Sequence, residues 1–210
     1  MPMKPPQQNV YIIDDDEAVL DSLGTYLDAV GFITKTWSDP RSFLDAYRHE
    51  WCGCLLLDIH MPTLSGLGLQ QELVAVGSTL PIIFMTGRGD VSTAVQAMKA
   101  GAFEFIEKPF AHEALREHIQ RAFAVDVQRR EALGQQQQIR ERLNTLTPRE
   151  SEVLDYVLNG KATKVIAIEL SLSQRTVEIY RANIMQKMQS KSVAQLVKML
   201  SAFRGGSHAT

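Results

Sequence analysis

The sequence of 210 residues is poor in the features that mark exported or membrane-bound proteins. No apolar run approaches the ~20 residues of a membrane span. The N-terminal stretch MPMKPPQQ lacks the apolar core of a signal peptide. The only cysteines, Cys52 and Cys54, are poorly spaced for a mutual disulfide and have no ligand partners for a zinc site. We therefore expect two small buried residues in a cytoplasmic protein without a membrane partner.

The chain as a whole also lacks a large excess of charge of either sign, since its formal net charge is −2. That balance hides an asymmetry. Residues 1–124 carry 9 Lys or Arg against 16 Asp or Glu, whereas residues 143–210 carry 9 against 5. An acidic front and a basic back predict two modules, of which the second could face a polyanion.

Short apolar runs alternate with helical patterns in the first part of the chain. The expected strands are 10–13, 32–36, 54–57, 81–85 and 103–106. The expected helices are 17–30, 40–48, 65–75 and 91–100. This alternation predicts an α/β fold, a doubly wound five-stranded parallel sheet with helices on both faces.

Ligands of such sheets bind beyond the carboxyl ends of the strands. The stretch VYIIDDDEAV places Asp14, Asp15 and Asp16 there, and Asp58, Thr86 and Lys108 follow three further strands. Two carboxylates about 4 Å apart repel by roughly 4 kcal/mol at an effective dielectric of ~20, so a cation is expected among them.

Four interpretations of this acidic cluster compete. The sequence gives little support for a nucleotide-binding turn, because GRGDVS lacks a third glycine. Helix capping explains Asp16 but not the convergence of Asp58 and Lys108. A dehalogenase-type phosphatase would carry D-x-D-G-T where this chain has DDDEA. A phosphoryl-accepting aspartate beside Mg²⁺ accounts for all of these groups.

Four motifs and their spacing, within residues 8–124, carry a resemblance to a known family: YIIDDDEAV, LLLDIHMPTLSG, FMTG and FEFIEKPF. They resemble the receiver domain of two-component response regulators, in the FixJ-like branch. The resemblance implies that Asp58 accepts the phosphoryl group, with Thr86 and Lys108 assisting. It implies a Mg²⁺ site, with Mn²⁺ as a possible substitute, whose ligands are Asp15, Asp58, the backbone carbonyl of His60 and, through water, Asp14. It further implies a switch of Thr86 and Phe105 and a cis peptide before Pro109.

Residues 111–143 have a helical pattern that grows polar along its length. Leu115, Ile119, Ala122 and Phe123 form an apolar stripe, which breaks at Asp126, Arg129 and Arg130. No heptad pattern persists, so we expect a solvated linker helix over 125–142, between a receiver at 1–124 and a second domain at 143–210.

The second domain is predicted to be all α-helical. Thr147 and Glu150 match a capping box, with Pro148 at the first helical position. The expected helices are 148–158, 163–170, 174–188 and 192–202. The stretch LTPRESEVL, with GKATKVIAIELSLSQRTVEIYRANIMQKM, resembles the LuxR-type four-helix, helix-turn-helix DNA-binding domain. Thr163 and Tyr180 depart from the asparagine and histidine usual in that family.

Helical spacing gives the expected recognition helix two faces. Val177, Ile184 and Met188 should face the core, with Arg175, Ile179, Ala182 and Gln186 opposite. An exposed Ile179 could touch a thymine methyl, and Glu178 could accept from cytosine N4. The expected phosphate contacts are Lys161, Lys164, Arg181 and Lys187. The candidate DNA-binding set is completed by Thr163, Arg175, Tyr180 and Ala182.

Together these features predict a cytoplasmic transcription regulator and not an enzyme. Its expected partners are a sensor histidine kinase, double-stranded promoter DNA, RNA polymerase and a second copy of itself after phosphorylation, with activation as the expected effect. The alternatives are a small Mg²⁺-dependent phosphatase and a DNA-binding regulator controlled by something other than phosphate.

Overall fold

The computed structural model describes residues 7–87 and 91–206. The chain divides into two compact units, residues 1–131 and 132–210, and each is described by itself. The fold of each follows from the local chemistry of the sequence.

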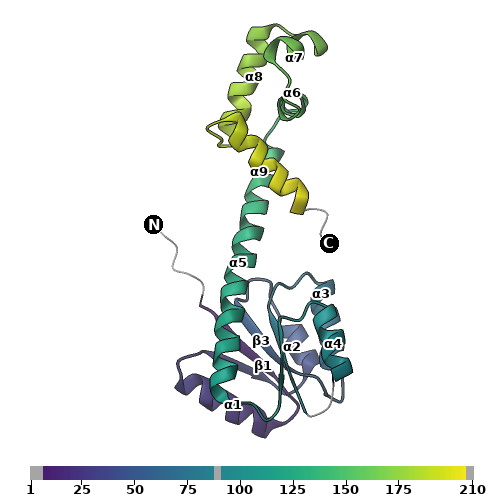
Figure 1. Cartoon of the computed structure of the whole chain (residues 1–210), viewed down its shortest axis with the longest axis vertical. Coiled ribbons are helices and arrows are strands. Elements are labelled where there is room, and N and C mark those ends of the chain that lie inside the picture. The colour runs from purple at the N-terminus through teal and green to yellow at the C-terminus, as the bar shows by residue number, and fades with distance from the viewer. Residues whose placement is uncertain (1–6, 88–90, 207–210) are drawn as a thin grey trace. The chain divides into compact units, whose positions relative to one another are not determined.

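A parallel sheet forms the centre of the first unit (Figure 1). Its strands are β1 (Asn9–Ile13), β2 (Thr34–Trp37), β3 (Gly53–Asp58), β4 (Ile82–Thr86) and β5 (Glu104–Glu107). The strand order is β2-β1-β3-β4-β5. Every residue of β3 is buried, as expected for a central strand covered on both faces. The reversal of strand order between β1 and β3 creates the crevice in which ligands of such sheets bind.

Helices cover both faces of this sheet, which confirms the predicted fold class. They are α1 (Glu17–Ala29), α2 (Pro40–Ala46), α3 (Gly66–Ala75), α4 (Val91–Lys99) and α5 (His112–Asn144). Alternate strand residues point to opposite faces and so build two cores. Tyr11 and Leu57 pack with α2, α3 and α4 on one face, and Ile12 and Leu56 pack with α1 and α5 on the other.

Side-chain caps fix where these helices begin. Asp16 accepts from the Ala18 amide and starts α1, and Asp39 accepts from the Ser42 amide and starts α2, with Pro40 at its first turn. Because these two helices begin shortly after β1 and β2, the caps also fix the path of the chain at the carboxyl ends of those strands.

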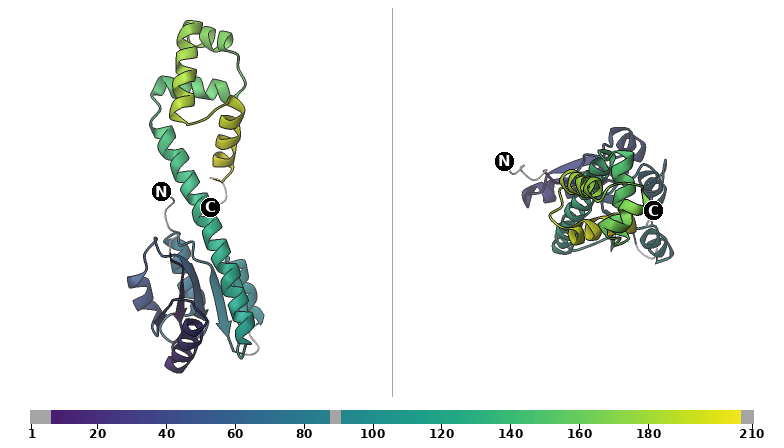
Figure 2. Two further views of the ribbon diagram at one scale, coloured as in Figure 1. Left: turned by 90° about the vertical axis from the view of Figure 1, so that its left-hand side faces the viewer. Right: turned by 90° about the horizontal axis from the view of Figure 1, so that it is seen from above.

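Helix α5 stays packed on the first unit further than the sequence predicts. Leu115, Ile119 and Ala122 lie against the sheet as expected, along the part of α5 that runs beside it in Figure 2. The solvated linker helix expected over 125–142 is wrong at Asp126, because this residue is fully buried. Its carboxylate accepts from the Gly53 amide at 2.9 Å and from Arg130 Nε at 3.0 Å. Asp126 and Arg130 therefore hold the start of β3, whereas Arg129 is exposed as expected.

The second unit is helical around one core of its own. After the end of α5 come α6 (Pro148–Leu158), α7 (Thr163–Glu169), α8 (Gln174–Lys187) and α9 (Val193–Gly206). Val153, Ile166, Val177 and Leu196 contribute one buried residue from each of these helices. The predicted capping box of Thr147 and Glu150 is present, with Pro148 at the first turn.

Within residues 7–87 and 91–206, no helix is long and apolar enough to cross a membrane. Cys52 and Cys54 are free thiols and buried, as expected.

Candidate phosphoryl and DNA-binding sites

The carboxyl edge of the sheet brings together groups from three strands. Asp14 directly follows β1, Asp58 ends β3 and Lys108 directly follows β5. The Lys108 ammonium donates to Asp14 Oδ2 at 2.6 Å and to Asp58 Oδ1 at 2.7 Å. The cation that the sequence requires among these aspartates is therefore supplied, in part, by the chain itself.

Burial and the neighbouring charges have opposite effects on the pKa values of the groups in this cluster. Burial raises the pKa of Asp14, which is only 2% exposed, against the lowering effect of its hydrogen bond from Lys108. Burial by itself lowers the pKa of Lys108, but the hydrogen bonds to Asp14 and Asp58 outweigh it and raise that pKa above its usual range. Lys108 is therefore fully charged at neutral pH.

Asp58 is oriented through both of its carboxylate oxygens. Oδ1 accepts from Lys108, and Oδ2 accepts from the backbone amide of His60 at 2.7 Å. The Asp58 residue is 8% exposed, so the carboxylate is fixed and still reachable from solvent. Asp15 lies beside Asp14 with an exposed side chain.

Thr86 ends β4, and Phe105 lies on the neighbouring strand β5, in register with Phe84. Thr86 is 1% exposed, and its hydroxyl has no hydrogen-bond partner in the described part of the chain. Phe105 is half-buried against the core on the α3 and α4 face. The Lys108–Pro109 peptide is cis, as expected. A buried hydroxyl without a partner costs about 1–3 kcal/mol, so Thr86 has an acceptor to gain.

The donors fit a hard divalent cation that keeps much of its water. Asp14, Asp15 and Asp58 offer carboxylate oxygens, and one ammonium does not neutralise three carboxylates. No group of three or more His, Cys, Asp or Glu side chains in the described ranges is gathered closely enough to bind a metal alone. Mg²⁺ binds through one or two carboxylates and several waters, which suits this arrangement.

Gly66, at the start of α3, supports the site and was missed by sequence reasoning. A Cβ atom there would lie 2.3 Å from the backbone oxygen of Asp58. The Gly66 amide also donates to the Ile59 carbonyl at 2.9 Å. The glycine after PTLS therefore lets α3 approach the acceptor strand, and the sequence signals for it are its place at the end of the LLLDIHMPTLSG motif and one residue past the Ser65 cap.

In the second unit, α8 presents the two faces that helical spacing predicts. Val177, Ile184 and Met188 are buried, whereas Arg175, Ala182 and Gln186 are exposed. Ile179 is 53% exposed, which is high for an isoleucine flanked by polar residues. Ser173 caps the helix by accepting from the Thr176 amide at 3.0 Å. This exposed face has the composition of a base-reading surface.

The remaining candidate DNA contacts lie in different surroundings. Glu178 and Lys164 are exposed, and Thr163 and Arg181 are half-buried. Tyr180 packs partly against the core of the unit, so less of its side chain is available than the sequence suggests. Lys161 lies 3.5 Å from Glu169, an exposed pair of little energetic value.

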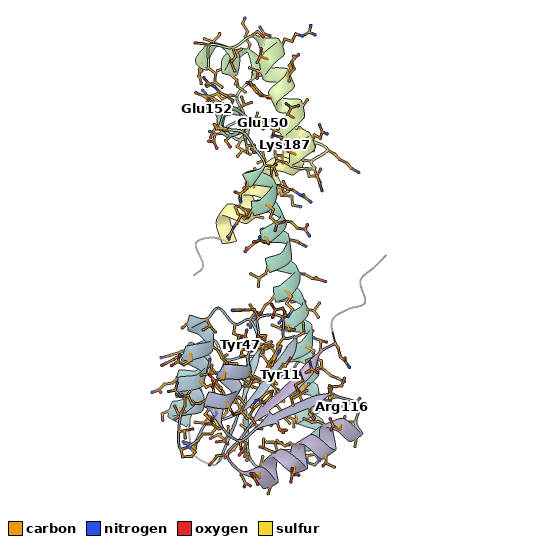
Figure 3. All side chains as sticks on the ribbon, turned by 180° about the vertical axis from the view of Figure 1, so that it is seen from behind. Tyr11, Tyr47, Arg116, Glu150, Glu152 and Lys187 are labelled. Carbon is orange, nitrogen blue, oxygen red and sulfur yellow. The ribbon has the colours of Figure 1, made fainter. Side chains whose placement is uncertain are left out.

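Lys187 differs from the other basic candidates because its ammonium already has partners inside the unit. It lies 2.5 Å from Glu150 Oε2 and 3.0 Å from the backbone oxygen of Thr145. Figure 3 labels Glu150 and Lys187 beside one another among these helices.

An acidic sheet edge with a lysine-held aspartate, followed by a helix-turn-helix unit, defines a response regulator with a DNA-binding output domain. Two family models match: the response regulator receiver domain over residues 10–120 and the bacterial regulatory proteins of the luxR family over residues 144–200. The chain belongs to the two-component response regulators of the FixJ/NarL class, in the FixJ-like branch. It is a DNA-binding regulator of transcription.

Two named relatives match along nearly the whole chain. The transcriptional regulatory protein FixJ of Bradyrhizobium diazoefficiens is 42% identical over 200 residues, covering 94% of this chain and 96% of FixJ. The response regulator protein TmoT of Ectopseudomonas mendocina is 41% identical over 190 residues, covering 90% and 86%.

Solved structures agree. The response regulator StyR superposes with a TM-score of 0.84 at 39% identity, covering 93% of this chain and 98% of StyR. Full-length FixJ from B. japonicum gives a TM-score of 0.59 at 40% identity, covering 95% and 98%.

Proposed function

We propose that this cytoplasmic regulator is switched by phosphorylation of Asp58, with a sensor histidine kinase as donor and promoter DNA as the target. The observation that carries the proposal is the double hydrogen bond of Lys108 to Asp14 and Asp58 at 2.6 and 2.7 Å. These bonds hold the Lys108 ammonium against the Asp58 carboxylate, where it can contact the oxygens of an incoming phosphoryl group.

In the proposed reaction, a carboxylate oxygen of Asp58 attacks phosphorus and the bond from phosphorus to the donor nitrogen breaks. The nitrogen keeps the electron pair, and the product is an acyl phosphate on Asp58. Lys108 neutralises charge on the phosphoryl oxygens as it develops. Asp15, Asp58 and the His60 carbonyl would hold Mg²⁺ or Mn²⁺, with Asp14 joined through water. Such an ion would supply further positive charge at the phosphoryl oxygens.

Thr86 and Phe105 are proposed to relay the change. The Thr86 hydroxyl has no partner in the described structure and gains one when phosphoryl oxygens arrive. Movement of Thr86 toward them would vacate space for the half-buried Phe105, on the face shared with α3 and α4. The state of Asp58 would then alter the surface over these helices.

The output is proposed to be dimeric binding to promoter DNA that aids RNA polymerase, so that the regulator activates. Ile179, Glu178, Arg175 and Ala182 on α8 would read base edges. Lys161, Lys164 and Arg181 would contact phosphates, with Thr163 and Tyr180 beside them. The excess of basic residues over 143–210 supports a polyanionic partner.

Incubation with Mg²⁺ and a small phosphodonor tests the acceptor. Intact mass should rise by one phosphoryl group in the wild type and in the control Asp45→Asn, which removes an exposed carboxylate of α2 away from the site. Asp58→Asn should gain none. A phosphoryl group on Asp58→Asn would place the acceptor elsewhere.

Experiments can distinguish the proposed function from two alternatives. A Mg²⁺-dependent phosphatase would turn over a free phosphate ester repeatedly, whereas the proposed regulator would release at most one equivalent per chain. A regulator independent of phosphate would bind its DNA equally well with Asp58 intact or replaced by Asn.

A further inference from the structure

Lys187 closes a hydrogen-bonded network between segments that are far apart in sequence. Its ammonium lies at the C-terminal end of α8, and Glu150 lies in the first turn of α6, 37 residues earlier. The same ammonium donates to the Thr145 carbonyl at 3.0 Å, just after the end of α5. The network therefore joins α8, α6 and the turn before α6.

Glu150 is committed to this network. It is 3% exposed, and its Oε2 accepts from the Thr147 amide at 2.8 Å as part of the capping box. The hydrogen bond from Lys187 and the one from the Thr147 backbone lower the pKa of Glu150, so the carboxylate is charged at neutral pH. A buried carboxylate that loses its cation is strongly destabilised.

A contact between Lys187 and a DNA phosphate would compete with these hydrogen bonds. Glu150 and Thr145 already take two of the three donors of the Lys187 ammonium, so only one donor is left for a DNA phosphate, and the Glu150 carboxylate already offsets the positive charge. Lys164 on α7 is exposed and bears no such constraint. The two lysines should therefore behave differently in DNA binding.

We propose that Lys187 is a positioning residue for DNA recognition: it holds the C-terminal end of α8 to the start of α6, and so sets the direction of the base-reading face. This deepens the proposed function, on which it rests. Arg142 supports the same end of α8 by donating to the Met188 carbonyl at 3.4 Å. Base-edge contacts need this orientation because they are directional, whereas phosphate contacts tolerate small rotations.

The test compares two substitutions that remove the same ion pair with opposite effects on net charge. Full-length Lys187→Met and Glu150→Gln would be titrated against a duplex selected from a random pool and a scrambled duplex, over a range of salt. Each variant should lower the ratio of the two affinities by about tenfold, the worth of one mismatched base pair. Neither should change the slope of log affinity against log salt. The double variant should lose no more than either single one.

Lys164→Ala is the control for a phosphate contact. It should flatten the salt slope by about one unit and leave the ratio unchanged. Amide exchange over α6–α9 would establish that each variant is folded at the assay temperature, since partial unfolding lowers both affinities together and cannot change their ratio.

The proposal is overturned if Lys187→Met flattens the salt slope by about one unit with an unchanged ratio, as a phosphate ligand would. If Lys187→Met does not fold, Glu150→Gln decides: an unchanged ratio overturns the proposal. Failure of the proposed function would look different, because the wild type itself would then prefer no duplex.

Discussion

At the scale of single residues, the phosphoryl site is held in its resting form by one ammonium and completed by one hydroxyl. Lys108 satisfies Asp14 and Asp58, but the Thr86 hydroxyl has no partner among the described residues. The resting site is thus stable at its carboxylates and incomplete at its hydroxyl. Arrival of a phosphoryl group should give the Thr86 hydroxyl an acceptor and should compete with the two carboxylates for Lys108.

Thr86→Val should separate the resting state from the switched state. It replaces a buried, unpaired hydroxyl by a methyl of similar size, so the resting protein should keep or gain up to ~1 kcal/mol of stability. The extra stability that beryllofluoride, a phosphoryl mimic, gives the wild type should shrink. Denaturation with and without beryllofluoride measures both. An undiminished gain in Thr86→Val would show that the hydroxyl is not the relay.

Because of Glu150, the free energy of unfolding of the second unit should depend on pH in the acidic range. Its hydrogen bond from Lys187 lowers its pKa below the ordinary value of 4.5. Because the folded pKa is the lower one, this stabilisation is present above pH 4.5 and is lost as pH falls through the lowered pKa. The protection of amides over α6–α9, taken relative to the intrinsic exchange rate at each pH, should therefore fall in that window less steeply in Glu150→Gln than in the wild type. An equal fall in both proteins would contradict this.

At the scale of elements, the sequence predicts most of the fold because each element carries its own signals. The strands alternate with capped helices, and the helices that begin at Pro40 and Pro148 are marked by an N-cap and proline together. These signals are local. The faces of α8 follow equally from helical spacing alone.

What the sequence cannot predict depends on contacts between distant residues. Helical spacing marks Asp126 as a break in an apolar stripe. It cannot distinguish a carboxylate exposed to water from one that is buried against the start of β3. The pairing of Lys187 with Glu150 is equally invisible, because nothing near either residue indicates the other. Gly66 was missed because its role comes from the Asp58 backbone that it approaches.

Asp126→Ala should weaken the first unit substantially. The substitution leaves the buried Gly53 amide without its acceptor and Arg130 without its carboxylate. A buried amide without an acceptor costs about 1–3 kcal/mol, and loss of the partly buried ion pair adds to that cost. Both tryptophans of the chain, Trp37 and Trp51, lie in this unit, so tryptophan fluorescence during denaturation reports on it selectively.

Arg129→Ala is the matched control for this prediction. Arg129 is exposed and donates to the Thr79 carbonyl at 3.2 Å, so its loss should cost less than ~1 kcal/mol. Equal losses in the two variants would mean that the Asp126 carboxylate adds nothing beyond ordinary helix packing.

At the scale of the whole molecule, acidic and basic residues are divided between two functions. Residues 1–124 carry the acidic excess that suits a metal and a phosphoryl group, and residues 143–210 carry the basic excess that suits DNA. With 9 basic against 5 acidic residues, one copy of the second part should bind DNA weakly.

Phosphorylation is expected to raise that affinity by producing a dimer through the receiver. The linker shows no persistent heptad pattern, which leaves the receiver surface as the switchable contact, and a symmetric dimer would match repeated half-sites. Sedimentation at tens of micromolar should show a monomer that becomes a dimer with beryllofluoride. A monomer that persists while DNA binding improves would favour release of the DNA-binding unit instead.

The central claim is that phosphorylation of Asp58 controls DNA binding. Its most direct test is the affinity of the full chain for a selected duplex, with and without beryllofluoride, in the wild type and in Asp58→Asn. The wild type should gain about 5- to 150-fold, the usual range of coupling between two sites, and Asp58→Asn should not respond. No gain in the wild type, or an equal gain in both proteins, would contradict the claim.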